Sequence, residues 1–240
     1  GSIFGMLGPN GAGKTTTIET LVGLYERDAG EVKVLGLDPQ TDLQELKSRI
    51  GVQLQSPSLF PRLTVKEILN LFASFYDEPL EVDDVMSRVG LEEKQQNRVK
   101  SLSGGQQHRL AVGLAMISNG DLIFLDEPTT GLDPKARRQL WDVILNLKKD
   151  GITVFLTTHY MEEAEELCDE LVIIDQGQVI ANDSPSHLIE NYFKEDAVEF
   201  SNPGLTESEK PKREQLKFVS KITYEEKEGN IIMYTENISR

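Results

Sequence analysis

The sequence predicts an α/β fold with a mostly parallel core sheet, and three features of its 240 residues support this prediction. Short apolar segments alternate with amphipathic helical segments, which is typical of parallel strands covered by helices on both faces. The segment Leu122–Leu125 is apolar at every position, as expected for a strand that is buried on both faces. A glycine-rich loop joins the first strand to the first helix.

The strands are expected where short apolar runs lie between turn residues. In chain order these runs are Ile3–Leu7, Val32–Leu35, Ile50–Leu54, Leu122–Leu125, Val154–Leu156, Leu171–Ile174 and Val179–Ile180. Gln176-Gly177 separates the last two runs and predicts a β-hairpin, so we expect an antiparallel element beside the parallel strands.

Helices are expected where apolar residues recur every three or four positions or where a capping residue begins the segment. The first helix follows the glycine-rich loop, and a short one is expected after Asp42, which stands at capping-box spacing from Glu45. Asp133-Pro134 predicts another start, with aspartate at the N-cap and proline at the first helical position. The remaining helices are expected near Val82–Val89, Ser103–Ile117, from Met161, and at Pro185–Phe193.

The region between Thr64 and Leu102 interrupts the alternation, because only helices are expected there. Thr64 and Glu67 stand at capping-box spacing at its start. The apolar side chains that follow recur at the helical period and are expected to pack against the core. They are Val65, Ile68, Leu69, Phe72, Phe75 and Tyr76. We therefore predict a helical lobe over about 64–118, inserted into the α/β core.

The chain is expected to divide into a main domain over 1–195 and a small α+β appendage over 196–240. Residues 201–213 are rich in Pro, Ser, Glu and Lys. Beyond them, Phe218–Tyr224 and Ile231–Tyr234 predict strands on either side of a Glu-Gly-Asn turn.

Composition limits the classes of function. A hydrophobic content of 38% is enough for a sizeable buried core. The net charge of -15 argues against general nucleic-acid binding, because an acidic surface repels phosphate backbones. The single cysteine, Cys168, allows no internal disulfide, which fits a reducing compartment. No apolar run approaches the ~20 residues that a membrane-spanning helix needs.

The loop after the first strand has the Walker A pattern, in which two glycines flank four residues and are followed by lysine and threonine. It comprises Gly8, Pro9, Asn10, Gly11, Ala12, Gly13, Lys14, Thr15 and Thr16. Its backbone N–H groups and the N-terminus of the next helix favour bound phosphate. We expect Lys14 on the β- and γ-phosphates, Thr15 on Mg²⁺ and Thr16 on a further phosphate oxygen.

Two carboxylates, Asp126 and Glu127, follow the apolar strand at Leu122–Leu125 directly. Ligands of parallel sheets gather at the carboxyl ends of the strands. Asp126 is expected to hold the Mg²⁺ that Thr15 also contacts. Glu127 is expected to orient or deprotonate an attacking water.

Four further segments carry a family resemblance. Leu102-Ser103-Gly104-Gly105-Gln106 resembles a signature sequence, Gly131-Leu132-Asp133-Pro134 a D-loop, and Thr157-Thr158-His159 a strand that ends in a switch histidine. Gln55 resembles a Q-loop glutamine. With the two Walker motifs, these six occur in the order of the ABC ATPases over about Ile3–Ile189, and the chain is identified as a member of that family. The resemblance implies a P-loop NTPase cassette with ATP and Mg²⁺ as its cofactors.

The resemblance implies catalytic roles within one chain for Lys14, Gln55, Glu127 and His159. Gln55 would contact Mg²⁺ or the attacking water, and it would sense a transmembrane partner through the loop that follows it. His159 would contact the γ-phosphate and help to hold Glu127 and the water.

Other residues would act on the ATP of a partner subunit. Ser103 and Gly105 would face the γ-phosphate across the interface, while Ser103 and Gln106 form a capping box that exposes the helix N-terminus. Asp133 would serve both as an N-cap and, less directly, across the same interface. The site would therefore be complete only in a head-to-tail homo- or heterodimer of cassettes.

Members of this family carry a further segment before the position of Gly1, including a residue that stacks on adenine. No adenine-stacking residue is therefore assigned in this chain. If the upstream strands are absent, we expect weak nucleotide binding and an exposed sheet edge.

The resemblance favours the motor subunit of a transporter, bound to transmembrane permease subunits at the cytoplasmic face of the cell membrane. Three segments and the short β-containing tail resemble the ABC-2 group of drug, antibiotic and lipid exporters; the segments are Gly8–Thr17, Phe60–Val65 and Thr157–Ala164. Import stays open as an alternative, because cassette motifs barely distinguish direction. A soluble ABC ATPase acting on ribosomes or DNA is disfavoured by the single cassette, the acidic charge and the lack of a long coiled coil between the Walker motifs.

Overall fold

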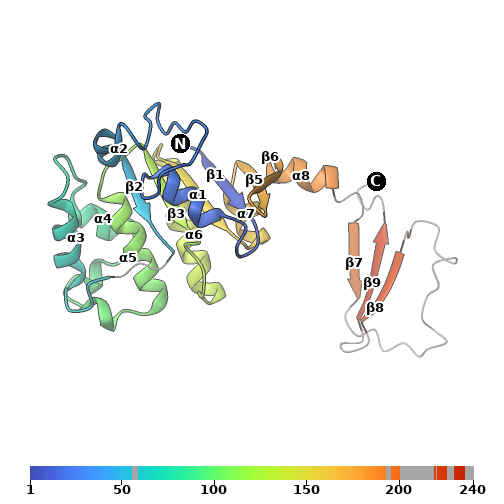
Figure 1. The fold of residues 1–240 in the computed structure, drawn as a ribbon. Coiled ribbons are helices and arrows are strands. Elements are labelled where there is room, and N and C mark those ends of the chain that lie inside the picture. The colour runs from blue at the N-terminus through green and yellow to red at the C-terminus, as the bar shows by residue number, and fades with distance from the viewer. Residues whose placement is uncertain (56–58, 193–195, 201–218, 220, 226–229, 236–240) are drawn as a thin grey trace. The chain divides into compact units, whose positions relative to one another are not determined.

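A computed structural model of the chain describes residues 1–55, 59–192, 196–200, 219, 221–225 and 230–235. The chain divides into two compact units, Gly1–Pro185 and Ser186–Arg240 (Figure 1). The domain boundary expected between residues 195 and 196 lies further along the chain than this division after Pro185, and it stays a prediction. Within the described residues, no helix combines the length and the hydropathy needed to cross a membrane.

The first unit is built on a six-stranded sheet in the order β2-β3-β4-β1-β5-β6. Its strands are β1 (Ile3–Leu7), β2 (Ile50–Gln53), β3 (Leu122–Asp126), β4 (Thr153–Thr158), β5 (Glu170–Asp175) and β6 (Gln178–Asp183). The first five pair in parallel, and β6 pairs antiparallel with β5 across the Gln176-Gly177 turn. The prediction of a mostly parallel sheet with an antiparallel element is confirmed.

Helices cover both faces of this sheet. In chain order they are α1 (Lys14–Leu21), α2 (Leu43–Arg49), α5 (Gly104–Met116), α6 (Pro134–Lys149) and α7 (Met161–Leu167). Helices α1 and α2 pack on one face, where Ile18 and Leu46 share a buried cluster with Phe124 of β3. Helix α5 lies on the other face, so close that a Cβ at Gly51 would stand 1.9 Å from the carbonyl oxygen of Ala115. Glycine at this strand position therefore allows the helix to approach.

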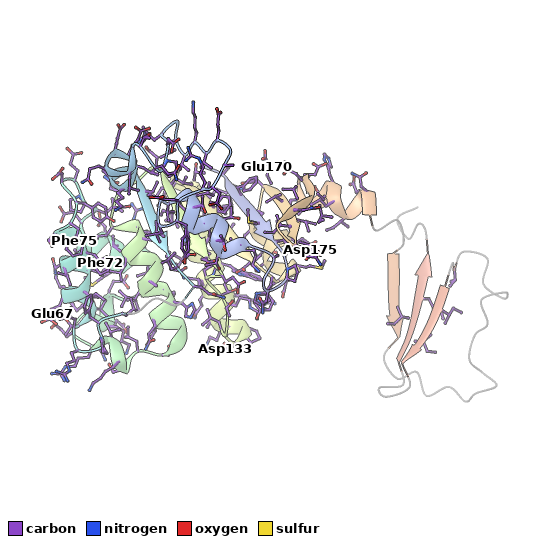
Figure 2. All side chains as sticks on the ribbon, in the orientation of Figure 1. Glu67, Phe72, Phe75, Asp133, Glu170 and Asp175 are labelled. Carbon is purple, nitrogen blue, oxygen red and sulfur yellow. The ribbon has the colours of Figure 1, made fainter. Side chains whose placement is uncertain are left out.

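The helical lobe consists of α3 (Val65–Ala73), α4 (Val82–Arg88), two short 3₁₀ turns, η1 (Glu92–Lys94) and η2 (Val99–Ser101), and then α5. The capping box at the start of α3 is confirmed, with Thr64 and Glu67 bonded reciprocally. Val65 and Ile68 are buried as expected, but Phe75 is 68% exposed. Figure 2 shows it beside Phe72, with ring centroids 5.8 Å apart. The expectation that the whole stripe packs inward is wrong at Phe75, because α3 ends before this residue.

The strand expected at Val32–Leu35 does not form. Val34 and Leu37 instead exchange backbone hydrogen bonds of 2.8 and 2.9 Å. Leu35 and Gly36 between them have φ of 52° and 82°. Two successive positive φ angles are typical of a type I′ turn, which reverses the chain before a longer strand can extend.

Helix α2 starts after Asp42 as expected, but the expected capping box is wrong. The carboxylate of Asp42 accepts a hydrogen bond of 2.9 Å from the backbone N–H of Asp38, and it makes no cap bond to the helix. A side chain of this type can bond upstream in a turn as readily as it caps a helix.

The second unit contains most of α8 (Pro185–Tyr192) and a three-stranded antiparallel sheet in the order β7-β9-β8. Strands β8 (Lys221–Glu225) and β9 (Asn230–Thr235) lie where the sequence predicts strands, and β7 (Asp196–Phe200) was not expected. Phe193, residues 201–213 and Phe218, which also entered the predictions, lie outside the described residues.

Candidate active site

The candidate site lies at the edge of the sheet where β1, β2, β3 and β4 end. These strands run in parallel, so the segments that follow them meet at the same edge (Figure 1). The glycine-rich loop follows β1, Gln55 follows β2, Glu127 follows β3 and His159 follows β4. The order of the sheet therefore assembles residues that stand far apart in the sequence.

The glycine-rich loop wraps around its own lysine. Gly11 and Gly13 have φ of 82° and 107°, a region that glycine enters without strain, and this lets the loop curl back. The Lys14 ammonium donates hydrogen bonds of 2.8 and 3.0 Å to the carbonyl oxygens of Gly8 and Pro9. Gly13 is the N-cap of α1, so the loop delivers an open helix N-terminus to the site.

Asp126 is fully buried and held by two hydroxyl groups. Thr15 donates a hydrogen bond of 2.8 Å to its Oδ2, and Thr157 donates one of 2.5 Å to its Oδ1. Thr157 stands opposite Asp126 in the parallel register of β3 and β4. The aspartate and the Thr15 hydroxyl therefore present adjacent oxygen atoms, the ligand type that Mg²⁺ prefers.

The backbone at Glu127 turns sharply as β3 ends. Its φ of 47° lies in the left-handed region, which is uncommon for a residue with a side chain. The Glu127 N–H is held by the carbonyl oxygen of Thr157 at 3.1 Å and by the Thr157 hydroxyl at 3.0 Å. These bonds fix the turn, which aims the Glu127 side chain along the sheet edge.

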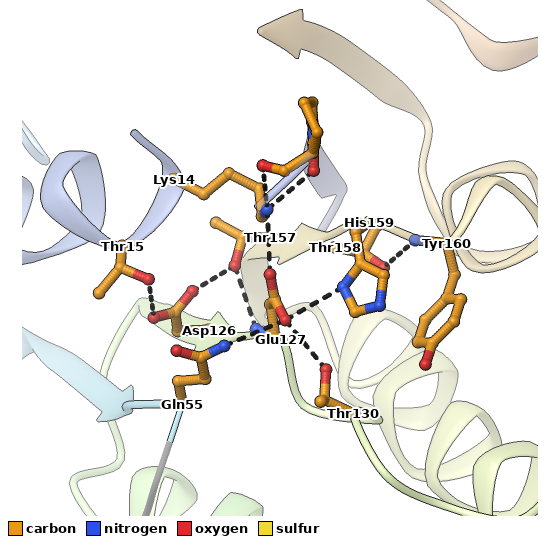
Figure 3. Close-up of polar contacts among 12 residues, drawn as sticks. Lys14, Thr15, Gln55, Asp126, Glu127, Thr130, Thr157, Thr158, His159 and Tyr160 are labelled. Carbon is orange, nitrogen blue, oxygen red and sulfur yellow. Dashed lines mark hydrogen bonds and ion pairs between the residues drawn. The ribbon is translucent and has the colours of Figure 1, made fainter. Parts of the chain in front are cut away.

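The Glu127 carboxylate is the centre of the polar network in Figure 3. Lys14 Nζ lies 3.0 Å from Oε1. Oε2 accepts hydrogen bonds from Gln55 Nε2 at 3.2 Å and Thr130 Oγ1 at 3.0 Å, and His159 Nδ1 lies 3.1 Å away. Glu127 thus contacts each of the other three residues for which a catalytic role within one chain is predicted.

The pKa of Glu127 reflects this environment. Burial acts first and raises the pKa of the carboxyl group, because the charged form loses hydration. Hydrogen bonds from Lys14 and Thr130, followed by the charges of Lys14 and His159, act in the opposite direction and leave the pKa below its ordinary value. Glu127 is therefore ionised at neutral pH and can accept a proton.

The remaining predicted residues lie at two helix N-termini. Ser103 and Gln106 form the expected capping box of α5, with hydrogen bonds of 2.9 and 3.3 Å. Asp133 caps α6 as expected and accepts two backbone hydrogen bonds of 3.0 Å. A Cβ at Gly105 would stand 2.8 Å from the Cβ of Ala136 in α6, so the two helix ends adjoin.

The residues of the phosphate loop that make no bond to the carboxylates differ in exposure. Pro9, Asn10, Gly11 and Thr16 are exposed, and nothing stands within 4 Å of the place where a Cβ on Gly11 would be. Ala12 is buried beneath the loop and accepts a hydrogen bond from the N–H of Gly177. The loop therefore packs against the protein at Ala12 and is exposed on its other side, which would allow a polyphosphate to bind to its amide groups.

Sequence reasoning missed Thr130 and Thr157. Placing β3 beside β4 in register would have set Thr157 opposite Asp126, so a signal for this contact existed. Thr130 carries no comparable signal, because its contact with Glu127 depends on how the turn after β3 closes. That turn includes a hydrogen bond of 3.2 Å from the Thr130 N–H to the carbonyl oxygen of Glu127.

A family model described as ABC transporter matches residues 1–130, which include the phosphate loop, Gln55, the signature segment and both carboxylates. The chain belongs to the ABC transporter family. Members of this family are ATPases, so ATP hydrolysis is the activity that membership implies. The prediction of the family is confirmed.

Curated ABC relatives include two ATP-binding proteins with informative names. The Nod factor export ATP-binding protein I of Burkholderia orbicola (strain AU 1054) is 40% identical over 208 residues, 85% of this chain and 68% of that protein. The linearmycin resistance ATP-binding protein LnrL of Bacillus subtilis (strain 168) is 34% identical over 236 residues, 96% of this chain and 76% of that protein.

Solved ABC cassettes share the fold. The cbiO1 protein of Clostridium perfringens, described as part of the ABC transporter complex cbiONQ, matches with a TM-score of 0.71 at 25% identity, over 79% of each chain. The ATP-binding cassette MJ0796, in a dimeric post-hydrolysis state bound to ADP and Pi, matches with a TM-score of 0.68 at 27% identity, over 77% of this chain and 85% of that one. These likenesses confirm the predicted P-loop cassette fold and support a cassette dimer.

Proposed function

We propose that this chain is the Mg²⁺-dependent ATP-hydrolysing motor of an ABC exporter, in which closure of two cassettes drives transport across a membrane. The observation that carries the proposal is the convergence of Lys14, Gln55 and His159 on the Glu127 carboxylate. Export is favoured because the relatives described above are named for export or for antibiotic resistance. A motor for import is the alternative.

The metal would lie between Thr15 and Asp126, whose oxygen atoms are 2.8 Å apart. When bound, Mg²⁺ supplies Lewis acidity to the phosphate oxygens. Asp126 is kept in place by Thr157 on its other oxygen. Gln55 Nε2 donates a hydrogen bond to Glu127, so the amide oxygen of Gln55 would be available to hold Mg²⁺ or the attacking water.

In the proposed reaction, Glu127 is the general base. A water molecule loses a proton to the Glu127 carboxylate while its oxygen bonds to the γ-phosphorus, and the bond from that phosphorus to the leaving ADP breaks. His159 stays beside the carboxylate and contacts the γ-phosphate, while Lys14 offsets the negative charge. The products are ADP and inorganic phosphate.

This role requires Lys14 to exchange partners. The Lys14 side chain is only 4% exposed, and its ammonium is bonded to Glu127 and to carbonyl oxygens of the loop. The γ-phosphate of ATP would compete with Glu127 for this ammonium. Nucleotide binding would thereby release the carboxylate for the water.

The second half of each ATP site would come from another cassette. Ser103 and Gly105 lie at the open N-terminus of α5, where backbone N–H groups favour an anion. Gln106 keeps this end ordered through its bond to the Ser103 N–H. Asp133 would reach across the same interface from the adjoining helix end.

A membrane subunit would dock at a cavity of about 840 Å³ in the first unit. It lies between α2 and β2 on one side and α3 and α5 on the other, and its apolar lining includes Leu24, Leu54, Phe72 and Phe75. Leu24 is 56% exposed and Phe75 is 68% exposed, so a partner that covers them gains apolar contact area. Leu54 precedes Gln55, so a partner seated here would lie beside the candidate active site.

The proposal predicts that Glu127→Gln binds ATP, forms a stable cassette dimer and hydrolyses ATP at least ~100-fold more slowly, because the general base is lost. Steady-state phosphate release and size-exclusion chromatography with ATP measure both effects. Undiminished turnover would remove Glu127 from its catalytic role.

The transporter assignment is tested by purifying the natural protein from its own cells in mild detergent and identifying its partners by mass spectrometry. A stoichiometric multi-spanning membrane protein is the expected result. Ribosomes or DNA without a membrane partner would contradict the transporter assignment and leave the ATPase assignment in place.

A further inference from the structure

Tyr160 follows the switch histidine, and its ring lies against the imidazole of His159 (Figure 3). The two ring centroids are 4.1 Å apart, with an angle of 40° between the planes. The guanidinium carbon of Arg137, from α6, lies 4.5 Å from the centre of the Tyr160 ring. We call these three side chains the Arg137–Tyr160–His159 stack.

The backbone that carries Tyr160 is fixed independently of this stack. The Tyr160 N–H donates a hydrogen bond of 2.9 Å to the hydroxyl of Thr158, and α7 begins directly after it. Helix α7 is tied to α6 by a hydrogen bond of 2.9 Å from Trp141 Nε1 to the fully buried Glu163. The Cα from which the tyrosine ring projects is therefore fixed relative to the sheet edge, whereas the ring itself depends on its side-chain neighbours.

The His159 imidazole needs a neighbouring group that limits its rotation. It is 27% exposed, and the polar contact that the structure describes for it is the one to Glu127 at 3.1 Å. One hydrogen bond does not prevent an imidazole from turning about its side-chain torsions. A ring packed against its face restricts that rotation and keeps Nδ1 directed at the carboxylate.

The Arg137 guanidinium lies against the Tyr160 ring and near the carboxylate of Glu162. The Arg137 side chain is 19% exposed and its Nε is buried without a hydrogen-bond partner, while Glu162 lies at 3.8 Å. A guanidinium at this distance from an aromatic face is attracted by the ring electrons. The Arg137 N–H also donates a hydrogen bond of 2.9 Å to the carbonyl oxygen of Asp133, so the stack is anchored at the capped start of α6.

We propose that Tyr160 is a positioning residue for His159 and that Arg137 holds the Tyr160 ring in place. The inference rests on the proposed function, because His159 matters only if it acts on the γ-phosphate. Since Arg137 follows Asp133 by one helical turn, the stack also joins the proposed dimer interface to the switch histidine. Movement of α6 on cassette closure would reach His159 through the ring.

The kinetic test compares four variants of the natural protein. Tyr160→Leu is expected to lower kcat roughly tenfold while KM for ATP changes less than about twofold, because misplacing His159 weakens the transition state more than nucleotide binding. Tyr160→Phe keeps the ring and should stay near the natural kcat. Arg137→Gln should lower kcat about threefold, since it loosens the ring without removing it. Arg138→Gln, an exposed neighbour on α6, is the matched control and should have no effect.

A spectroscopic signature separates positioning from a general structural role. The ring current of Tyr160 shifts the NMR signals of the His159 imidazole. These signals are recorded in nucleotide-free protein that is isotopically labelled at histidine. They are assigned by their loss in His159→Gln. Tyr160→Leu should move these signals and Tyr160→Phe should not. The signals of His108 and His187 should stay in place in both variants and thereby report an intact fold.

If Tyr160→Leu has the same kcat as the natural protein, the inference is overturned, whether or not the His159 signals move. If Tyr160→Leu fails to fold, Arg137→Gln decides, and an unchanged kcat with unchanged His159 signals overturns the role of the stack. Full activity of Glu127→Gln would instead reject the proposed function. The His159 signals would then still show whether Tyr160 orients the imidazole.

Discussion

The surroundings of Glu127 and the two helix ends at Ser103 and Asp133 belong to the same cassette, but they are finished to different degrees. The Glu127 carboxylate is surrounded by donors from four separate segments of the chain. In the part of the chain that the structure describes, the side chains of Ser103, Gln106 and Asp133 bond within the first turns of their own helices. We call Glu127 and the side chains that contact it the closed region. We call the N-termini of α5 and α6, at Ser103 and Asp133, the open helix ends.

This difference teaches how a shared site can be divided between two chains. The Glu127 carboxylate, which we propose as the general base, can be preassembled, because its partners come from adjacent strand ends of one sheet. Among the described residues, the α5 end at Ser103 has no such partners from other segments, and its dipole favours an anion supplied from outside. We therefore expect substitutions around Glu127 to act within one cassette and substitutions at the helix ends to act on its partner.

The largest expected effect comes from breaking the closed region at Lys14. Lys14→Met should weaken ATP binding at least ~100-fold, because the loop loses its charge toward the β- and γ-phosphates. It should also lower the melting temperature without nucleotide, since it leaves the buried Glu127 charge without its cation. Isothermal titration with ATP and thermal unfolding measure the two effects.

The double variant Lys14→Met with Glu127→Gln is the control for that charge. It should recover much of the melting temperature and none of the ATP affinity. A double variant that melts no higher than Lys14→Met would mean that the ion pair contributes nothing to the apo state.

A smaller effect is expected at the open helix ends. Ser103→Ala removes a cap and should cost about 1 kcal/mol of stability. Thr64→Ala is the matched control, because Thr64 forms the same capping box at the start of α3. Both should lower stability similarly, but only Ser103→Ala should reduce ATP turnover, and in mixed dimers the loss should fall on the site of the unsubstituted partner. Equal turnover in the two variants would contradict the proposed position of Ser103 on a partner's nucleotide.

How much of the two regions could be read from the sequence differs in the same way. The resemblance to the ABC ATPases placed Lys14, Gln55, Glu127 and His159 in one site, and the structure brings them together because the ends of parallel strands lie at one edge of the sheet. The capping boxes at Ser103 and Thr64 were predictable from local spacing alone. The failed capping box at Asp42 shows the limit of such spacing, since a turn upstream competes for the same carboxylate.

Contacts that depend on side-chain packing between elements were not predictable. The stack of Arg137 on Tyr160 needs the relative placement of α6 and α7, which no local pattern contains. The predictions that Phe75 is buried and that Leu35 lies in a strand failed for a related reason, because apolar character alone does not decide where an element ends. Hydrophobic pattern fixes the face of a helix or strand more securely than its length.

Thr130 provides a further test of the hydrogen bonds around Glu127. Thr130→Val removes a hydrogen bond of 3.0 Å to Glu127 and should raise the pKa of that carboxyl group, with turnover reduced about threefold at neutral pH. Thr129→Val is the control, because the neighbouring Thr129 hydroxyl is buried without a hydrogen-bond partner. It should leave turnover unchanged and raise stability slightly. A loss of turnover in both variants would point to a disturbed turn and not to the lost bond.

The smallest expected effect is the dependence of stability on pH that Glu127 contributes. Its folded pKa lies below the ordinary 4.5, so its ionised form stabilises the fold fully above 4.5 and this contribution is lost as pH falls through the folded value. Urea unfolding of the natural protein and of Glu127→Gln, without nucleotide, should therefore show a difference in stability that is constant at neutral and mildly acidic pH and shrinks as the pH falls below 4.5. The other carboxyl groups titrate in both proteins, so their effects cancel in the difference. A difference that stays constant to the lowest pH would mean that the donors around Glu127 do not lower its pKa, and the closed region would then be a matter of geometry alone.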